Sequence, residues 1–185
     1  MIQQEKNILR KKMNHHLQQE RGSATALAQL LNRIQTLPDW SHAKTILLFA
    51  PLFHEPDLLV LLKTPARSFF FPLMQEGTLH LYEWFSDAHW IQGAHSIQEP
   101  DPTTWQQRSL AEVDLALIPG LAFDAQGGRL GWGRGYFDRL LGNPTCRALK
   151  IGIAWSWQIV PKIPREDHDV KMDFVVTPEK IFHAE

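Results

Sequence analysis

A buried strand, a glycine-rich loop and a short helix are predicted in succession by residues 114–138, which read DLALIPGLAFDAQGGRLGWGRGYFD. The run Asp114–Ile118 is apolar without alternation, as expected of a strand that is covered on both faces, and Pro119-Gly120 ends it. The turn signal Gln126-Gly-Gly128 follows, and residues 135–142 fit a helix. Strand, loop and helix in this order are the unit from which α/β domains are built.

The rest of the chain repeats this alternation of strands and helices. We expect helices over residues 3–20, 24–36 and 57–63, and strands over residues 45–50, 67–71, 79–84, 149–155 and 174–177. Pro72 is expected to close the second of these strands, and residues 86–108 to be mainly loop. The pattern predicts one α/β domain over residues 1–185. It is a three-layer domain with a central, mostly parallel sheet flanked by helices, and with two N-terminal helices.

Composition is that of a single-domain globular protein. The chain has 185 residues, a mass of 21.3 kDa, a net charge of −1 and 44% hydrophobic residues. This length is enough to bury a core without disulfides or structural metals. The single cysteine, Cys146, excludes a disulfide framework and a multi-cysteine zinc site, and it predicts a reducing, cytoplasmic environment. No apolar run approaches the ~20 residues of a membrane span, so no membrane partner is expected.

The charge is distributed unevenly along the chain. Residues 1–44 carry 7 basic and 3 acidic side chains, residues 45–116 carry 3 and 9, and residues 117–185 carry 9 and 8. The acidic middle segment would repel a phosphate backbone, so no nucleic-acid partner is expected. The basic groups of the two ends would form a site for a smaller anion if the fold brings them together.

The loop carries three alternating glycines, Gly131, Gly133 and Gly135, between the strand and the helix. Backbone without Cβ atoms allows close approach of a ligand, and successive amides can surround an anion. Arg129 and Arg134 could hold phosphate oxygens. The spacing matches neither a P-loop nor a dinucleotide-binding fingerprint. These residues alone therefore leave phosphate binding and a purely structural turn as open alternatives.

Several acidic and basic residues also allow two interpretations. Asp138 could stabilise the start of a helix, or it could bind Mg²⁺ together with Asp169 of the late acidic run. Glu55 follows the first strand, at the edge of an α/β sheet where ligands bind. Lys6 and Arg10 lie four residues apart on one helical face, which fits either a solvated basic surface or a ligand site.

The chain becomes recognisable when its short motifs are read in order. They are Lys6-Asn-Ile-Leu-Arg10, Glu55, Ile97-Gln-Glu-Pro100, Ile118–Asp124, Arg129–Asp138, and Val160–Asp169 followed by Val176-Thr177. Their order and spacing resemble the 5-formyltetrahydrofolate cyclo-ligase family, also called 5,10-methenyltetrahydrofolate synthetase, over nearly the whole chain. Phe137 departs from the tyrosine usual in the family, so a polar role at that position is in doubt while aromatic packing is not.

The resemblance implies an ATP-dependent, Mg²⁺-dependent reaction of 5-formyltetrahydrofolate. The formyl oxygen would take the γ-phosphoryl group of ATP and so become a good leaving group. Folate nitrogen 10 would then attack the activated carbon to give 5,10-methenyltetrahydrofolate, ADP and phosphate. The protein would contribute mainly positioning and charge neutralisation.

The resemblance also assigns site residues by their position in these motifs. ATP-binding positions would be Lys6, Asn7, Ile8, Leu9, Arg10, Arg129, Leu130, Gly131, Trp132, Gly133, Arg134, Gly135, Tyr136 and Phe137. Folate-binding positions would be Ala50, Glu55, Trp132, Gly133, Arg134, Gly135 and Tyr136. The catalytic residues would be Arg129, Arg134 and Tyr136, and Asp138 and Asp169 would bind Mg²⁺.

Two other functions are weighed against the cyclo-ligase. A sugar-phosphate isomerase would also use an anion-binding loop, but it predicts no requirement for ATP and gives no reason for Lys6 and Arg10. A non-catalytic folate- or nucleotide-binding module would be expected to lack some of the charged site residues, yet Arg129, Arg134, Asp138 and Asp169 are all present. Nothing in the sequence indicates an obligate interface, so a monomer is expected.

Overall fold

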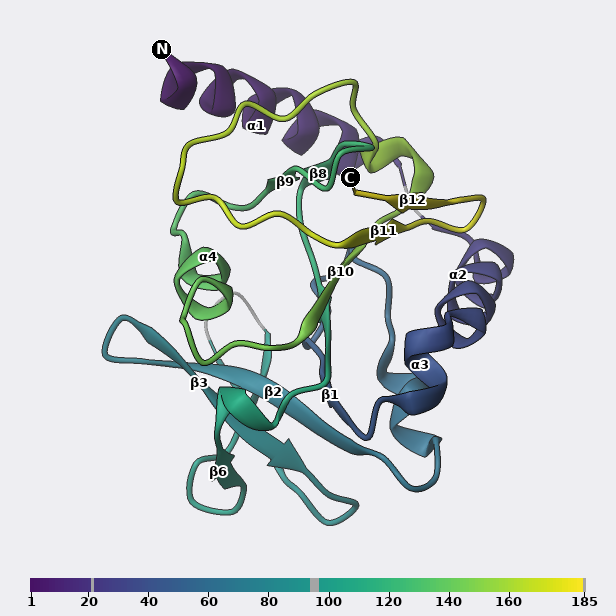
Figure 1. The fold of residues 1–185 in the computed structure, drawn as a ribbon, viewed down its shortest axis with the longest axis vertical. Coiled ribbons are helices and arrows are strands. Elements are labelled where there is room, and N and C mark those ends of the chain that lie inside the picture. Colours follow the sequence, from purple (N-terminus) through teal and green to yellow (C-terminus); the bar gives the residue numbers. More distant parts are fainter. Residues whose placement is uncertain (21, 94–96, 185) are drawn as a thin grey trace.

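A mixed sheet forms the centre of the computed structural model, which describes residues 1–20, 22–93 and 97–184 (Figure 1). Its strand order is β12-β11-β10-β7-β1-β2-β3-β6. The strands are β1 (Thr45–Leu47), β2 (Ser68–Gln75), β3 (Thr78–Trp84), β6 (Gln106–Arg108), β7 (Leu115–Ile118), β10 (Leu149–Ile153), β11 (Phe174–Val176) and β12 (Ile181–His183). The neighbouring strands β11, β10, β7, β1 and β2 are parallel to one another. The pairings of β12 with β11, of β3 with β2 and of β6 with β3 are antiparallel. The prediction of a mostly parallel sheet is confirmed.

Helices surround this sheet and cap its upper end in Figure 1. They are α1 (Ile2–Gln19), α2 (Ala24–Thr36), α3 (Pro38–His42) and α4 (Tyr136–Leu141), with the short 3-10 helices η1 (Leu59–Lys63), η3 (Leu110–Glu112) and η4 (Ser156–Gln158). Ser23 begins α2 as expected of an N-cap, because its Oγ accepts a hydrogen bond from the amide of Ala26 at 3.0 Å. Among the helices described, none combines the length and apolar character needed to cross a membrane.

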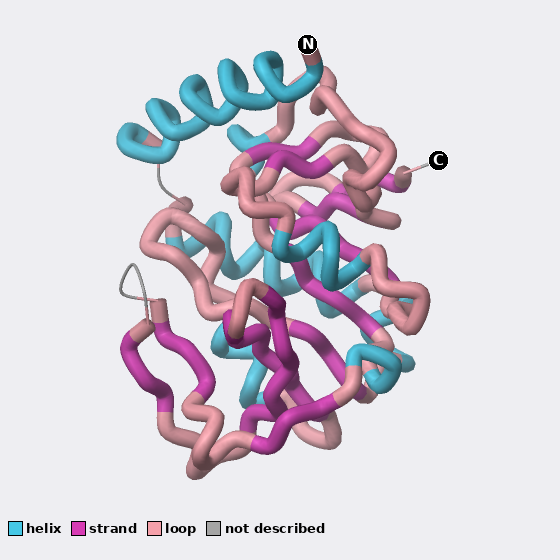
Figure 2. Tube along the Cα trace, turned by 90° about the vertical axis from the view of Figure 1, so that its left-hand side faces the viewer, coloured by secondary structure: helices cyan, strands magenta, loops and turns pink. Residues whose placement is uncertain are grey.

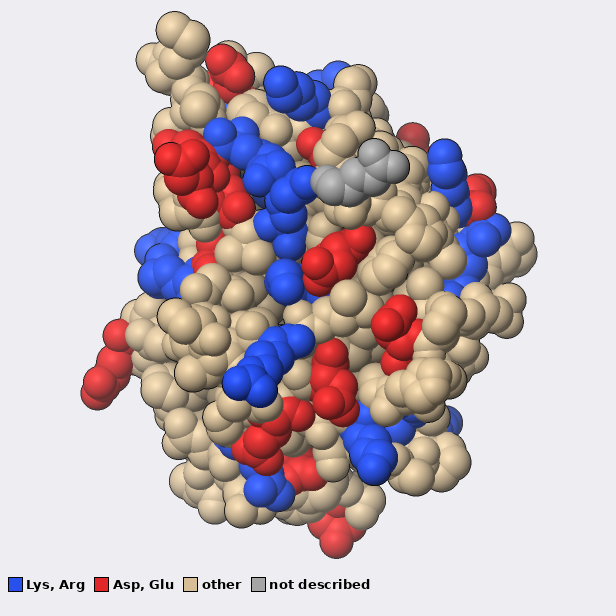
Figure 3. All heavy atoms as spheres, in the orientation of Figure 1, with Lys and Arg blue, Asp and Glu red and all other residues tan. Residues whose placement is uncertain are grey.

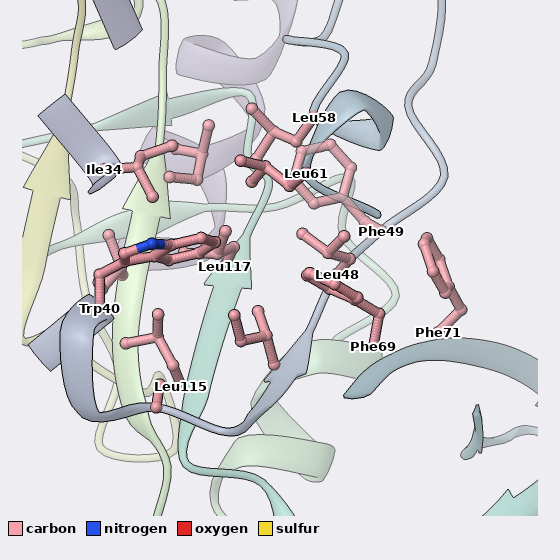
Figure 4. Packing of buried hydrophobic residues seen from close by; sticks show 14 of the residues in the cluster. Ile34, Trp40, Leu48, Phe49, Leu58, Leu61, Phe69, Phe71, Leu115 and Leu117 are labelled. Atoms are coloured by element: carbon pink, nitrogen blue, oxygen red, sulfur yellow. The ribbon is translucent and has the colours of Figure 1, made fainter. Parts of the chain in front are cut away.

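Alternate side chains of the parallel strands fill two apolar layers. Phe69 and Phe71 of β2 belong to the layer that contains Trp40, on the side of α2, α3 and η1 (Figure 4). Phe70 belongs to the opposite layer, which contains Leu141 of α4. All four residues of β7 are buried, as a strand covered on both faces requires. The three-layer α/β prediction is therefore confirmed, and both layers depend on the sheet as their common wall.

Some predicted strand limits are wrong because they depend on pairing that local sequence does not show. Strand β2 passes through Pro72 and ends at Gln75. Its pairing with β1 ends at Phe70, so beyond that residue β3 is the one strand among the described residues that pairs with it, and proline is tolerated in such a one-sided stretch. The β2–β3 turn is Glu76-Gly77, with positive φ angles of 48° and 81°, as a two-residue hairpin requires.

The segment expected to be mainly loop, residues 86–108, contains short strands as well. The strands β4 (Trp90–Gln92) and β5 (Gln98–Pro100) pair with each other, and β6 extends the main sheet. The expected strand over residues 45–50 ends at Leu47, and β12 was not predicted. The Ile97-Gln-Glu-Pro100 motif thus lies in and next to β5.

Helix α1 packs away from the main sheet, on a small hairpin at its upper end. This hairpin consists of β8 (Ala122–Phe123) and β9 (Arg129–Leu130). Met13 and Leu17 of α1 form a buried cluster with hairpin residues and with Ile163. The first two predicted helices therefore have different roles, since α2 covers the sheet and α1 covers the loops that follow its strands (Figure 2).

Buried Asp124 holds this hairpin to the segment around Ile163. The side chain of Asp124 is 2% exposed. Its Oδ1 accepts hydrogen bonds from the amides of Gln126 and Gly128 at 3.0 and 2.8 Å, and its Oδ2 accepts one from the amide of Ile163 at 2.8 Å. Three amide donors stabilise a buried carboxylate that would otherwise be costly to desolvate.

We expect Asp124→Asn to lower the free energy of unfolding by about 2–4 kcal/mol, because an amide group would direct its own N–H toward these donors. Urea unfolding at neutral pH measures the change. Asp87→Asn, at an exposed aspartate, is the matched control and should change the stability by less than about 0.5 kcal/mol. Equal stability of Asp124→Asn and the control would contradict this role for Asp124.

Candidate functional site

The glycine-rich loop connects β9 to α4 at the end of the sheet where the parallel strands terminate. Gly133 and Gly135 have φ angles of 104° and 65°, which strongly favour glycine. Gly135 is the N-cap of α4. The loop therefore has a backbone conformation that suits glycine, and the lack of Cβ atoms at these positions allows close approach to its backbone.

Arg10 of α1 contacts this loop directly. Its Nε donates a hydrogen bond to the carbonyl oxygen of Gly131 at 3.0 Å, and its Nη1 donates one to Oδ1 of Asn7 at 2.7 Å. A Cβ atom added to Gly133 would lie 3.4 Å from Cζ of Arg10. The fold thus brings together two predicted ATP-binding segments that are 121 residues apart.

Lys6 is buried between two carboxylates of the late acidic run. It is 4% exposed, and its Nζ lies 2.8 Å from Oε2 of Glu166 and 2.5 Å from Oδ2 of Asp169. The amide of Glu166 also donates to Oδ2 of Asp169 at 2.6 Å. A predicted ATP-binding lysine and a predicted metal ligand are therefore paired with each other, and Glu166 joins them.

These contacts shift the pKa values of both groups toward the charged forms. Burial alone would lower the pKa of Lys6, but the hydrogen bonds and charges of Asp169 and Glu166 outweigh it and raise that pKa. Burial would likewise raise the pKa of Asp169, but the amide of Glu166 and the ammonium of Lys6 lower it. Lys6 and Asp169 are thus an ion pair across the neutral pH range.

Arg129 lies beneath the loop and pairs with Asp138. The arginine is 8% exposed, and its Nη2 lies 2.8 Å from Oδ2 of Asp138. Its guanidinium is also 5.6 Å from the centre of the Phe137 ring, so the aromatic packing expected at that position is present. The other oxygen of Asp138, Oδ1, accepts a hydrogen bond from the amide of Val170 at 3.3 Å. This contact places Asp138 beside the segment that carries Asp169.

Arg134 differs from Arg129 in being exposed. Its carbonyl oxygen accepts a hydrogen bond from Arg139 at 3.0 Å, and Arg139 also lies over the ring of Tyr136, 5.1 Å from its centre. Within the residues that the structure describes, no hydrogen bond or ion pair engages the guanidinium of Arg134. Of the two predicted catalytic arginines, Arg134 is thus the one whose charge is accessible from solvent.

Glu55 and Trp132 contact each other and form one wall of the candidate site, which we call the folate wall. Oε2 of Glu55 accepts a hydrogen bond from the amide of Leu52 at 2.9 Å, and the side chain of Trp132 donates another. The rings of Trp132 and His54 lie 5.5 Å apart. Trp132 is nevertheless 48% exposed, so part of its indole is open for stacking on a planar ligand. Burial raises the pKa of Glu55 to about 7, because it outweighs both hydrogen bonds.

The remaining predicted site residues are placed less directly. Ala50 is half-buried beyond the end of β1, in the segment that leads to Glu55. Ile8 is 69% exposed on α1, whereas Leu9 and Leu130 pack in the cluster between α1 and the hairpin. For Leu9 and Leu130 the structure supplies a packing role, and their contact with ATP stays a prediction. Glu166 was missed as a site residue because an acidic run in a loop is usually a solvated surface.

The carboxylates fit a divalent cation by their chemistry. The carboxylates of Asp138 and Asp169 offer the hard oxygen atoms that Mg²⁺ prefers. In this structure Arg129 neutralises the charge of Asp138, and Lys6 neutralises that of Asp169. Ligand atoms of Glu166, His168 and Asp169 also lie within 4.8 Å of one another. The residues present are therefore compatible with Mg²⁺ once Lys6 or Arg129 yields its place.

The comparison with known proteins identifies the family of the chain. The sequence model of the 5-formyltetrahydrofolate cyclo-ligase family matches residues 2–178. The chain belongs to this family. Cyclo-ligases of this family are ATP-dependent and act in folate one-carbon metabolism, and the chain is such a ligase. Membership favours the enzyme over the isomerase and the binding module that the sequence alone left open.

Relatives of the cyclo-ligase family match along most of the chain. The 5-formyltetrahydrofolate cyclo-ligase of Escherichia coli is 29% identical over 180 residues, which cover 94% of this chain and 96% of the relative. That of Mycolicibacterium smegmatis is 28% identical over 167 residues, covering 86% and 84%. The solved 5,10-methenyltetrahydrofolate synthetase of Aquifex aeolicus has a TM-score of 0.84 and 30% identity, covering 97% of this chain and 93% of that one.

The raised pKa of Glu55 predicts a pH dependence of stability in the ligand-free cyclo-ligase. Its pKa is about 7 in the folded chain against an ordinary value of 4.5, so folding disfavours the carboxylate. Its contribution to stability is therefore greatest below pH 4.5 and is lost progressively as the pH rises to 7. Glu55→Gln, which cannot ionise, should remove this part of the decline.

Urea unfolding at pH 5 and pH 8 measures the effect. We expect the stability lost between these pH values to be smaller in Glu55→Gln than in the wild type, with Glu76→Gln, at an exposed turn, behaving as the wild type. The same decline in all three chains would show that burial of Glu55 does not control it.

Proposed function

We propose that the chain activates 5-formyltetrahydrofolate by transferring the γ-phosphoryl group of ATP to the formyl oxygen, after which nitrogen 10 closes the ring. One observation carries this proposal. The contacts of Arg10 with Gly131, and of Lys6 with Asp169, hold α1 against the glycine-rich loop and the late acidic run, and the same loop carries Trp132, which hydrogen-bonds to Glu55. An acceptor on the folate wall would lie next to a phosphoryl group on the glycine-rich loop, as in-line transfer requires.

In this proposal each part of the site has one task. The backbone of Gly131, Gly133 and Gly135 and the side chain of Arg10 hold the phosphates. Arg134 stabilises the charge that develops on the transferring group. Trp132 stacks on the folate ring, and Glu55 hydrogen-bonds to it, with Ala50 completing that wall. Tyr136, the first residue of α4, contacts the transferring group through its hydroxyl.

Arg129 and Lys6 have more indirect roles, because both are buried in ion pairs. Arg129 positions Asp138 and stabilises the transferring charge from beneath the loop. Asp138 and Asp169 would hold Mg²⁺, which when bound neutralises charge on the phosphates. Lys6 would then leave Asp169 for a phosphate oxygen, while Glu166 keeps its ammonium near the site.

The same proposal includes a monomer located in the cytoplasm, with 5-formyltetrahydrofolate and ATP as its partners and with neither nucleic acid nor membrane as a partner. The acidic middle segment supports the exclusion of nucleic acid. Size-exclusion chromatography with light scattering tests the monomer.

Isotope transfer tests the phosphorylation directly. Substrate labelled with ¹⁸O in the formyl group is incubated with the purified chain, ATP and Mg²⁺, and the methenyl product is followed by its near-ultraviolet absorbance. Because the formyl oxygen leaves with the phosphoryl group, mass spectrometry should find one ¹⁸O atom in each phosphate released. Turnover that yields unlabelled phosphate would contradict the proposed intermediate.

Arg134→Ala should lower kcat by at least ~10²-fold, the usual effect of losing one contact to transition-state charge. Arg147→Ala, which removes another exposed arginine that makes no hydrogen bond or ion pair among the described residues, is the control and should leave kcat unchanged. A kcat for Arg134→Ala within a factor of three of the control would remove this residue from the mechanism.

The pairing of both aspartates with protein cations predicts that metal binding depends on the nucleotide. Mg²⁺ alone should not raise the melting temperature, because Lys6 and Arg129 already neutralise Asp169 and Asp138. With a non-hydrolysable ATP analogue, Mg²⁺ should tighten binding by about ten-fold, equivalent to ~1.4 kcal/mol. In Asp138→Asn, Mg²⁺ should no longer tighten binding of the analogue. If Mg²⁺ still tightens it ten-fold in this variant, Asp138 has a structural role and does not bind the metal.

A further inference from the structure

Glu55 belongs to a tight turn that follows β1. The amide of Glu55 donates a hydrogen bond to the carbonyl oxygen of Leu52 at 2.9 Å, and Oε2 of Glu55 accepts one from the amide of Leu52 at 2.9 Å. The two bonds close a four-residue β-turn over residues 52–55. They fix the carboxyl group relative to its own turn, but the turn must still be held in place relative to the sheet.

Trp155 connects this turn to the end of β10. Its indole nitrogen donates a hydrogen bond to the carbonyl oxygen of His54, the third residue of the turn, at 2.9 Å. The two residues are 101 positions apart in the sequence. Trp155 is 6% exposed, so this hydrogen bond is shielded from water. Loss of its donor would leave a carbonyl group of the turn without a partner that water easily replaces.

Trp155 is itself held by a buried glutamine. The amide of Trp155 donates to Oε1 of Gln158 at 2.8 Å, and Nε2 of Gln158 donates to the carbonyl oxygen of Gly120 at 2.7 Å. Gln158 is 1% exposed, and Gly120 follows the end of β7. Hydrogen bonds therefore join the loops after β1, β7 and β10 at the edge of the sheet where ligands of α/β proteins bind.

His54 transmits this support to both residues of the folate wall. Its backbone is bonded to Trp155 and leads directly into Glu55. Its ring lies 5.5 Å from the ring of Trp132, which in turn donates a hydrogen bond to Glu55. The positions of Glu55 and Trp132 therefore both depend on where Trp155 holds His54.

We propose that Trp155 is a positioning residue for 5-formyltetrahydrofolate, a role that rests on the proposed function of the folate wall. Its indole N–H holds the 52–55 turn, so that Glu55 is in place before the ligand arrives. Trp155 acts through His54 and does not itself touch the substrate. Fixing a binding group in advance lowers the entropic cost of binding, so this contact contributes to affinity for the folate.

ATP binding provides an internal reference, because Trp155 carries no charge. Figure 3 shows basic side chains in a band over the upper part of one face, beside a group of acidic ones. A neutral replacement at Trp155 leaves all of these charges in place, together with the contact of Arg10 with the glycine-rich loop. It also keeps the backbone amide that bonds to Gln158. We therefore expect an effect on the folate alone.

Trp155→Phe removes the N–H donor and keeps an aromatic ring. The KM for 5-formyltetrahydrofolate should rise about five- to ten-fold, equivalent to ~1–1.4 kcal/mol, while kcat and the KM for ATP change by less than two-fold. Site-specific replacement of Trp155 by 3-benzothienylalanine should have the same effect. This analogue has the two-ring shape of tryptophan with sulfur in place of the N–H, so it tests the donor even if Trp155→Phe folds poorly.

Trp105→Phe is the matched control. Trp105 is 4% exposed, and its indole nitrogen also donates to a histidine carbonyl oxygen, that of His89, at 2.7 Å. It packs against Phe71 and Trp90. This variant should lose stability but leave both KM values within two-fold of the wild type. Equal changes in the two variants, or a parallel rise of both KM values in Trp155→Phe, would overturn the positioning role.

Calorimetry with 5-formyltetrahydrofolate, in the absence of ATP, separates this inference from the proposed function. Glu55→Ala should weaken binding by about ten-fold, and adding Trp155→Phe to it should weaken binding by less than Trp155→Phe does alone. Fully additive effects, or wild-type affinity in both Trp155 variants, would overturn the positioning role only. Unchanged affinity in Glu55→Ala would contradict the folate wall itself, and the role of Trp155 with it.

Discussion

An ammonium group held between two carboxylates joins the ends of this protein. Lys6 lies in the second turn of the first helix, and its partners Glu166 and Asp169 are 160 and 163 residues away. A lysine this buried needs such compensation, because an isolated charge away from water is far too costly. The contact therefore fixes where α1 lies. Everything that α1 brings to the candidate site, from Lys6 to Arg10, depends on that placement.

The parallel strands end at one edge of the sheet, and the site collects there. Loops after β1 and β9 supply Glu55 and the glycines, and α1 closes over them. The polar residues of the site lie in these loops and on α1, β9 and α4, while the two apolar layers are formed by strands of the main sheet and the helices that cover them. This division lets the loops carry chemistry without weakening the core, as is common in α/β enzymes.

Much of this architecture could be predicted from the sequence, and the reasons for success and failure are physical. Local signals were sufficient for β7, with its buried apolar run, and for α2, with Ser23 as its cap. They failed at Pro72, because the tolerance for proline depends on which side of β2 is paired. The residues Lys6 and Asp169 were recognised by motif, but their mutual pairing and the part of Glu166 depend on contacts across the whole chain.

The short outer strands have a consequence for the protein at high concentration. The sheet ends in β12 and β6, each three residues long and antiparallel to its neighbour. β6 consists of Gln106, Gln107 and Arg108, which offer a second molecule little apolar surface. A strand of three residues is a poor template for adding a strand from another chain, and the polar side chains of β6 make that edge poorer still. The same sheet that provides a wide buried wall inside the domain is thereby protected against growing into aggregates.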